Sequence, residues 1–158
     1  MGNDRDWEAL VEKYYEPIYR YCFHMSKTAA DAEDATQQTF LKAHQKRSAL
    51  DSIENEKAWL YRIARNTCID RLRKLKRAIV ALTEGLEPSY TPTLDIVGTK
   101  LRELIEALPQ KQREVFILRH LHDFSTAETA EFLRIRPGSV KAHLKRAVDR
   151  LKAEFTGE

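Results

Sequence analysis

Hydrophobic residues recur every three or four positions along most of this chain, which is the spacing of amphipathic helices. No glycine or proline occurs between Ile18 and Glu84. Because these two residue types are the strongest breakers of regular structure, the stretch predicts successive helices with short polar connections. The first helix is expected over about residues 6–25, and Pro17 within it predicts a kink or a local break.

Two further helices are expected in this half of the chain. Thr28 or Asp31 is placed to cap a helix that runs to about residue 46, since a side-chain oxygen there accepts a hydrogen bond from a free first-turn amide. A polar connection over residues 48–56 leads to a third helix, expected over about residues 56–76.

The helical spacing stops over residues 79–98, where two prolines and two glycines indicate a flexible linker. Beyond the linker, one short helix is expected to end at Pro109 and another near residue 120. Ser125, followed by Glu128 three positions later, has the spacing of a capping box and predicts the start of a further short helix.

Residues 125–133, a short turn and residues 137–152 have the layout of a helix-turn-helix. Pro137 sits where a first-turn proline belongs, because its missing N–H has no partner there in any case. No segment has the alternating pattern of a β-strand. The predicted fold is therefore all-α, with two small helical bundles joined by a flexible linker. The expected parts are residues 1–78, the linker 79–98 and residues 99–158.

Composition narrows the class of protein. A length of 158 residues with 42% hydrophobic and 32% charged residues describes one ordinary or two small folded domains, and excludes a large enzyme barrel. No apolar run of about 18 residues suggests a membrane helix, and the first residues do not resemble a secretory signal. Two cysteines do not make a disulfide framework, so the cytoplasm is the expected compartment. Cys22 and Cys68 fall on apolar faces, which favours inert core thiols.

The net charge of +3 conceals two basic segments. Residues 57–77 carry eight basic side chains and one acidic one, and residues 134–152 carry seven basic and one acidic. The segments before and after the first of these, residues 1–56 and 78–98, are both acidic overall. Two focused basic stripes, each on its own helix, favour contact with nucleic-acid phosphates over a merely solvated face.

The last predicted helix has an apolar face and a basic face. The apolar face, which must pack on the preceding helices, consists of Val140, Leu144, Ala147, Val148 and Leu151. The opposite face and its flank present Ser139, Lys141, Ala142, Lys145, Arg146 and Asp149. Small and basic side chains near the start of such a helix are suited to the base edges and phosphates of a major groove. The alternative is an exposed basic helix in a generic bundle.

The second predicted helix also has two faces. Its polar face carries Asp34, Gln37, Gln38 and the single apolar residue Leu41, at the spacing of one helix side. Phe40 lies on the other face, toward the core, with Ala32, Thr36 and Ala43. A polar strip with one exposed leucine suits docking of a partner helix, although acidic residues in a first turn also simply stabilise the helix.

The third predicted helix groups aromatic, amide and guanidinium side chains on one side. These are Trp59, Arg62, Asn66, Arg73 and Arg77. Rings that stack on bases, amides that pair with base edges and arginines that hold phosphates are what a single-stranded nucleic acid requires. The alternative is that Trp59 anchors the core and the arginines are solvated.

Taken together, these segments resemble the extracytoplasmic-function (ECF) sigma factors of bacterial RNA polymerase. The stretch Asp31–Asp34 with Gln37 and Thr39–Phe40 is similar to the family's polymerase-docking motif, and Trp59–Asn66 with Asp70–Arg71 to its promoter-melting motif. Leu108–Pro109, Arg113–Val115 and Gly138–Lys141 resemble its second DNA-binding domain. The order of the motifs and the position of the linker also match.

The resemblance implies partners and residue roles. Core RNA polymerase would be bound through its β′ clamp helices and β flap, with Asp31, Asp34, Gln37, Gln38, Phe40 and Leu41 at the clamp. Asn66 would capture a base flipped from the −10 element, beside Trp59, Arg62, Arg73 and Arg77. The −35 element would meet Ser139, Lys141, Ala142, Lys145 and Arg146. An anti-sigma protein is the expected regulator; no cofactor, membrane insertion or small-molecule substrate is implied.

Five positions depart from the family pattern. Gln38 replaces a frequent acid and His44 a frequent tryptophan, which affects the docking face. Thr129 stands where isoleucine is usual and Arg134 where the turn usually has glycine, so the geometry of that turn is less determined than the helices. Ala142 offers only a methyl group, which suits contact with thymine or none.

Other classes of function are less well supported. The pairs His120/His122 and Cys22/His24 have no second ligand pair at zinc-like spacing. No nucleophile–base arrangement, phosphate-binding glycine loop or paired acid and base is present, so an enzyme is not expected. A DNA-binding regulator that acts without polymerase and an RNA-binding adaptor remain alternatives, but both leave the face of Asp34 and Gln37 without a role.

Overall fold

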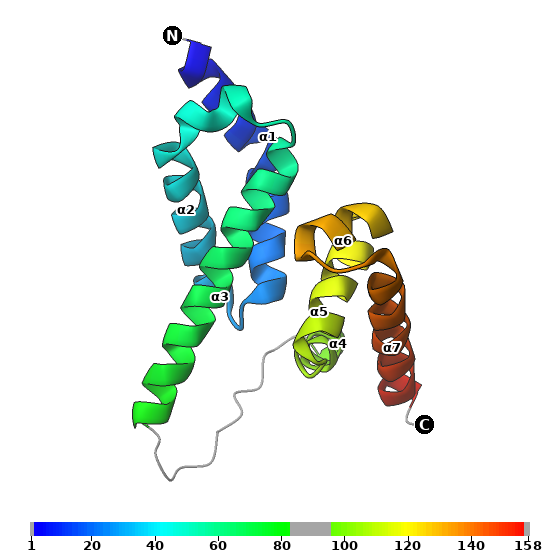
Figure 1. Ribbon diagram of the computed structural model, residues 1–158. Helices are drawn as coiled ribbons and strands as arrows, with labels where there is room; N and C mark the ends of the chain where they lie inside the picture. The colour runs from blue at the N-terminus through cyan, green and yellow to red at the C-terminus, as the bar shows by residue number, and fades with distance from the viewer. Residues whose placement is uncertain (1, 83–95, 157–158) are drawn as a thin grey trace. The chain divides into compact units, whose positions relative to one another are not determined.

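The computed structural model describes residues 2–82 and 96–156, and the chain divides into two compact units, Met1–Pro88 and Ser89–Glu158 (Figure 1). Every regular element in the described residues is helical, which confirms the all-α prediction. The residues between the two described ranges belong to the expected linker and lie outside the described part of the chain. None of the described helices combines the length and the apolar run that a membrane crossing requires.

The first unit is a bundle of three long helices, α1 (Gly2–Met25), α2 (Ala29–Gln45) and α3 (Glu56–Leu82). A short 3-10 helix, Arg47–Ser52, lies within the connection that was expected to be irregular. Each helix contributes small or apolar side chains to one core, and its buried members are Leu10, Ile18, Tyr21, Cys22, Met25, Ala32, Ala35, Phe40, Ala43, Leu60, Tyr61, Ala64 and Cys68. The periodic apolar positions of the sequence therefore meet at the centre of the bundle.

Pro17 does not interrupt α1, so the predicted local break is wrong. A proline inside a helix removes one backbone hydrogen bond and crowds the preceding turn, at a cost of about 3 kcal/mol. The residues that follow it, Ile18, Tyr21 and Cys22, are almost completely buried between the other two helices. Burial of three such side chains stabilises the continuous helix by more than the proline costs, since each contributes about 1.5–3 kcal/mol.

The two connections are closed by side-chain caps. The Thr28 hydroxyl accepts a hydrogen bond from the Asp31 amide at 3.1 Å, so Thr28, and not Asp31, caps α2. Asn55 does the same for α3, because its Oδ1 accepts from the Ala58 amide at 3.1 Å. These caps set where α2 and α3 begin, and hence which of their residues face outward.

α3 continues past the predicted end near residue 76 to Leu82. In Figure 1 its C-terminal part extends beyond the ends of α1 and α2. Consistent with this, every side chain from Arg73 to Leu82 is exposed. The basic segment of the sequence thus lies on a helix that projects from its bundle, which leaves its cations open to a large ligand.

In its described residues, the second unit contains four α-helices. They are α4 (Ile96–Glu106), α5 (Gln110–Phe116), α6 (Thr126–Leu133) and α7 (Pro137–Thr156). The predicted helix over residues 110–120 is confirmed up to Phe116, after which Ile117–Leu121 form a π-helical turn. The Phe124 amide donates back to the Leu118 carbonyl at 2.9 Å, which closes this turn. Helices α4, α5 and α6 all contact α7, so α7 is the helix against which the others of this unit pack.

The helix-turn-helix is formed by α6 and α7. Ser125 and Glu128 form the predicted capping box at the start of α6, with both hydrogen bonds at 3.0 Å. At the other end, the Ile135 amide donates to the Ala130 carbonyl at 3.0 Å while Arg134 adopts a left-handed conformation with φ 57° and ψ 47°. This is the arrangement that usually ends a helix with glycine.

Both ends of the segment expected as linker are helical. Residues 79–82 continue α3 and residues 96–98 begin α4. The helical spacing is hidden there because α3 has no buried face at its exposed end, and burial is what produces an apolar period.

Candidate functional site

The outward face of α2 carries most of the residues predicted to dock a partner. Asp34, Gln37, Gln38 and Leu41 are all exposed, and Asp31 is half-buried. Leu41 keeps 59% of its surface accessible, the most of any large apolar side chain described on α2. A leucine exposed among amides and a carboxylate forms a small apolar centre with a polar rim, which is the composition of a protein contact.

Phe40 does not belong to this exposed face, because it retains only 8% of its surface. Its ring stacks on Tyr15 with a centroid separation of 5.5 Å and meets Trp7 edge to face at 6.4 Å. His44, one turn further along α2, contacts the same Trp7 ring at 5.1 Å. Phe40 therefore lies beneath this exposed face and packs α2 against α1.

Arg71 on α3 connects the acidic start of α2 to the third helix. Its guanidinium lies 3.4 Å from the Asp34 carboxylate and 3.7 Å from that of Asp31. The resemblance placed Arg71 in the promoter-melting motif, whereas the structure directs its guanidinium to these two carboxylates. The sequence held one signal for this ion pair: Arg71 is a basic residue on a helix that packs against α2, and the first turn of α2 is acidic.

Lys42 makes a second polar link between the same helices. Its Nζ donates to the Thr67 hydroxyl at 3.0 Å, in a partly buried position. Thr67 retains 1% of its surface. Thr67 directly follows Asn66 in α3. This hydrogen bond therefore helps to fix the rotation of α3 about its axis, with Asn66 facing outward.

The outer side of α3 carries the aromatic and basic group predicted from the sequence. Asn66, Arg73 and Arg77 are exposed, while Trp59 and Arg62 are half-buried. Trp59 is therefore neither a fully buried anchor nor a freely exposed ring. At a rise of 1.5 Å per residue, the distance along the helix from Trp59 to Arg77 is about 27 Å. The stripe is long enough to follow several nucleotides of a strand.

In the second unit, α7 has the two predicted faces. Val140, Ala147 and Leu151 are buried, and Leu144 and Val148 are half-buried. On the other side Lys141, Lys145 and Arg146 are exposed, with Ser139 and Ala142 half-buried. A Cβ added at Gly138 would meet no atom within 4 Å, so the first turn of α7 is open to an approaching ligand.

The comparisons with known proteins decide the family. Residues 10–78 match the family model of sigma-70 region 2, and residues 99–151 match that of sigma-70 region 4. The ECF RNA polymerase sigma factor SigW of Bacillus subtilis is 32% identical over an alignment that covers 98% of this chain and 91% of the relative. The chain belongs to the ECF sigma factors.

Two further similarities agree with this assignment. The ECF RNA polymerase sigma factor SigL of Mycobacterium tuberculosis is 33% identical over 91% of this chain and 85% of the relative. A co-crystal structure of the sigma factor RpoE with the anti-sigma factor NepR from Bartonella quintana superposes with a TM-score of 0.77 at 26% identity, covering 96% of this chain and 98% of that one. The predicted resemblance is thus confirmed.

Within this ECF sigma factor, the region 2 match spans most of the α1–α3 bundle and the region 4 match spans α4 to most of α7. The exposed basic positions of α3 and of α7 both lie inside these matches. The residue-level roles of the two surfaces rest on their chemistry and geometry, and they are developed below as proposals.

The histidines considered as metal ligands do not form a cluster. His120 is exposed and its ring contacts Phe116 at a centroid separation of 5.1 Å, whereas His122 is buried. In the part of the chain that the structure describes, no group of three histidine, cysteine or acidic side chains is arranged to hold a metal ion.

Proposed function

We propose that this ECF sigma factor initiates transcription by binding core RNA polymerase through a docking face on α2. It would bind promoter DNA through two further surfaces, one on each unit. The observation that carries the proposal is the presence of an exposed basic face on α3 within the region 2 match and another on α7 within the region 4 match. A regulator that reads duplex DNA alone would need only the helix-turn-helix of the second unit.

The proposed contact with core RNA polymerase uses α2. Leu41 provides the apolar centre, and Asp34, Gln37 and Gln38 surround it with hydrogen-bonding groups. Phe40 acts indirectly, by supporting α2 through its rings with Tyr15 and Trp7. The β′ clamp helices are the proposed partner of this face and the β flap that of the second unit.

The proposed contact with the melted −10 element uses α3. Asn66 is exposed and its amide has both donors and an acceptor, so it is able to pair with the edge of a single flipped base. Arg73 and Arg77 extend along the same exposed side and would hold the phosphates. No bond of the DNA is broken or formed by these side chains, so we propose that the protein acts as a binding factor and not as an enzyme.

The proposed contact with the −35 element uses α7 in a major groove. Lys141, Lys145 and Arg146 are exposed and supply charge and donors, while Ser139 and Ala142 stand near the helix start. The residues 1–78 and 99–158 would thus act as a −10 module and a −35 module. Promoter DNA exists in the bacterial cytoplasm, where we propose that the protein works.

Regulation by an anti-sigma protein is also proposed for this chain. The structural similarity to RpoE supports it, because that sigma factor was crystallised with the anti-sigma factor NepR. Such a partner would inactivate the protein if it covered the α2 docking face or the basic faces of α3 and α7.

The decisive experiment is run-off transcription with core RNA polymerase on a genomic fragment library. We expect discrete promoter-dependent transcripts that require both the protein and core polymerase. Binding of duplex DNA without any transcript would instead support the regulator alternative. Binding of RNA in preference to melted DNA would support the adaptor alternative.

A further inference from the structure

The two cysteines of the described chain meet in the core of the first unit. Cys22 lies on α1 and Cys68 on α3, and they retain 0% and 1% of their surface. Both are free thiols, and a side-chain hydrogen bond joins them. The sequence favoured inert core thiols and did not show whether the two would meet. The structure instead forms a dithiol pair across the interface between two helices.

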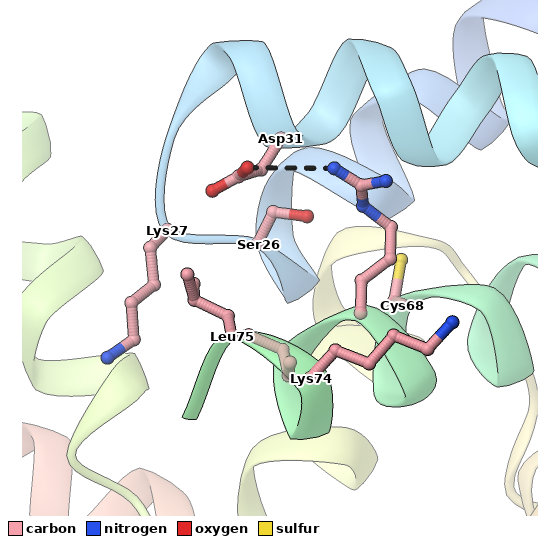
Figure 2. A pocket seen from close by; sticks show the side chains of 8 residues that line it. Ser26, Lys27, Asp31, Cys68, Lys74 and Leu75 are labelled. Carbon is pink, nitrogen blue, oxygen red and sulfur yellow. Dashed lines mark ion pairs between the residues drawn. The ribbon is translucent and has the colours of Figure 1, made fainter. Parts of the chain in front are cut away.

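A cavity reaches Cys68 from the surface. It has a volume of about 310 Å³ and is formed by the turn after α1, the start of α2 and the outer half of α3. Figure 2 shows Cys68 among the side chains that line this cavity, with Ser26, Lys74 and Leu75. Lys27, Lys74 and Leu75 are exposed, so the mouth of the cavity is at the protein surface. Cys22 is not part of the cavity wall.

The surroundings of the two cysteines favour a state in which one proton is shared between the two sulfur atoms. The hydrogen bond from Cys68 lowers the pKa of the Cys22 thiol, burial acts in the opposite direction, and the positive charge of Arg71 lowers the pKa further. The same contact with Cys22, together with burial, raises the pKa of Cys68. The hydroxyls of Thr36 and Thr39 are already donated to backbone carbonyls at 2.7 Å, so the proton of Cys68 is the donor that stabilises a Cys22 thiolate.

We propose that Cys22 and Cys68 are a redox-active dithiol that a small hydroperoxide, entering through the cavity, oxidises to an intramolecular disulfide between α1 and α3. Two thiols and one molecule of hydrogen peroxide give one disulfide and two molecules of water. The two thiols together lose two electrons, which reduce the O–O bond.

The reaction proceeds in two steps. The Cys68 sulfur attacks one peroxide oxygen as its proton passes to Cys22, and hydroxide leaves to take up a proton, which gives a Cys68 sulfenic acid. The Cys22 sulfur then attacks the Cys68 sulfur and displaces water, which forms the S–S bond. Cys22, the thiol that completes the disulfide, is already in contact with Cys68. Further oxidation of the Cys68 sulfenic acid therefore has to compete with disulfide formation.

The disulfide would alter the bundle at a position close to the proposed −10 surface. An S–S bond of about 2.05 Å draws the two sulfurs closer than any hydrogen-bonded pair of thiols. Cys68 follows Asn66 by two residues in α3, and Arg71 lies one turn beyond. We expect the oxidised protein to lose promoter opening several-fold. This consequence rests on the proposed function, whereas formation of the disulfide does not.

The first test is chemical and uses the full-length reduced protein. After treatment with hydrogen peroxide we expect an intact mass lower by two hydrogen atoms, no thiol left for alkylation, and one peptide pair that links Cys22 to Cys68. Two alkylatable thiols remaining in the folded protein, or dimers linked between chains, would overturn the proposal. Because this measurement uses the unaltered protein, it does not depend on whether variants fold.

Variants then test the route through the cavity. Leu75 lines the cavity and is 37% exposed, so Leu75→Trp is expected to obstruct it and slow disulfide formation several-fold. Leu82→Trp, on the same helix but outside the cavity, is the matched control and is expected to react as fast as the unaltered protein. Equal rates for both variants would overturn the assigned route.

The last test separates regulation from chemistry. Reduced and peroxide-treated protein are compared in run-off transcription, with Cys68→Ala as a control that cannot form the bond. We expect a peroxide-dependent loss in the unaltered protein that reductant reverses, and no loss in the variant. A disulfide without loss of transcription would overturn the regulatory consequence. Absence of transcription by the reduced protein would overturn the proposed function and leave the dithiol chemistry standing.

Discussion

The guanidinium of Arg71 on α3 lies 3.4 Å from the carboxylate of Asp34 on α2. The chain itself therefore supplies a basic partner for this exposed carboxylate. The pair leaves 63% of the Asp34 side chain exposed, so the carboxylate is oriented by Arg71 and still accessible. An acidic group held in one place costs less conformational entropy to bind than a free one.

The energy of this pair is measurable in a double-mutant cycle of Arg71→Ala and Asp34→Ala. We expect a coupling of about 0.2–1 kcal/mol in the free energy of unfolding, because the pair is partly exposed and surface ion pairs contribute in this range. The coupling should decline as salt is raised from low to high concentration. Chemical denaturation at several salt concentrations provides the measurement, and a coupling independent of salt would contradict an electrostatic origin.

Leu41→Ala should weaken binding to core polymerase without loss of stability. An exposed leucine contributes to a protein contact by burying its side chain there, and truncation at the centre of such a contact commonly costs more than 1 kcal/mol, or about fivefold or more in Kd. Leu82→Ala, an equal truncation of an exposed leucine at the end of α3, serves as control. Titration of labelled protein with core polymerase gives both affinities. Similar losses for the two variants would count against the α2 face.

Asn66→Ala should reduce promoter opening more than it reduces binding to duplex DNA. The amide is proposed to pair with a base that is available only after strand separation. Arg73→Ala, which removes a phosphate contact on the same helix side, should lower both quantities. Permanganate footprinting measures opening, and mobility shifts of the polymerase complex measure binding. Equal losses in opening and binding for Asn66→Ala would refute its assigned role.

Lys145→Ala and Arg146→Ala should weaken binding to the −35 element and make that binding less dependent on salt. Each lost phosphate contact lowers the slope of log K against log salt concentration by about 0.9. Loss of a base contact instead relaxes sequence preference, by about 1–3 kcal/mol at one position. Lys13→Ala, which removes the same charge from α1, is the control and should change neither. An unchanged affinity for both α7 variants would place the recognition face elsewhere.

Arg134→Gly should stabilise the second unit. Arg134 has φ 57° and ψ 47°, a conformation that costs a residue with a Cβ about 1–2 kcal/mol. Part of the gain is offset because glycine also makes the unfolded chain more flexible, so we expect a net increase of about 0.5–1 kcal/mol in unfolding free energy. Arg134→Ala removes the charge but not the strain, and it should give no increase. Thermal unfolding of the three proteins distinguishes the two effects.

Much of the fold was predictable because it depends on local chemistry. Thr28 was one of two expected caps of α2, and the capping box of Ser125 and Glu128 forms as predicted, since each cap involves atoms only three residues apart. The inward faces of α2 and α7 also follow directly from helical period. Pro17 was misjudged because its local cost is smaller than the stabilisation from tertiary burial of the residues that follow it.

The candidate surfaces were predictable to a similar extent. Exposure of Asn66, Leu41 and Lys145 follows from their place opposite an apolar face, which is a property of a single helix. Phe40 already fell on the core side by its spacing, and only the packing of α1 against α2 determined which rings it would meet.

The sequence by itself determined the order of the main helices, the capping box of α6, the two basic faces and the family to which the chain belongs. All of these depend on residue types at short spacing, or on motifs that keep their order. Only the tertiary structure decided that Arg71 turns to Asp34 and Asp31, that Lys42 reaches Thr67 and that Cys22 meets Cys68 beside a cavity. Those contacts join different helices, and their partners are set by the rotation and spacing of packed helices, which no single helical period specifies.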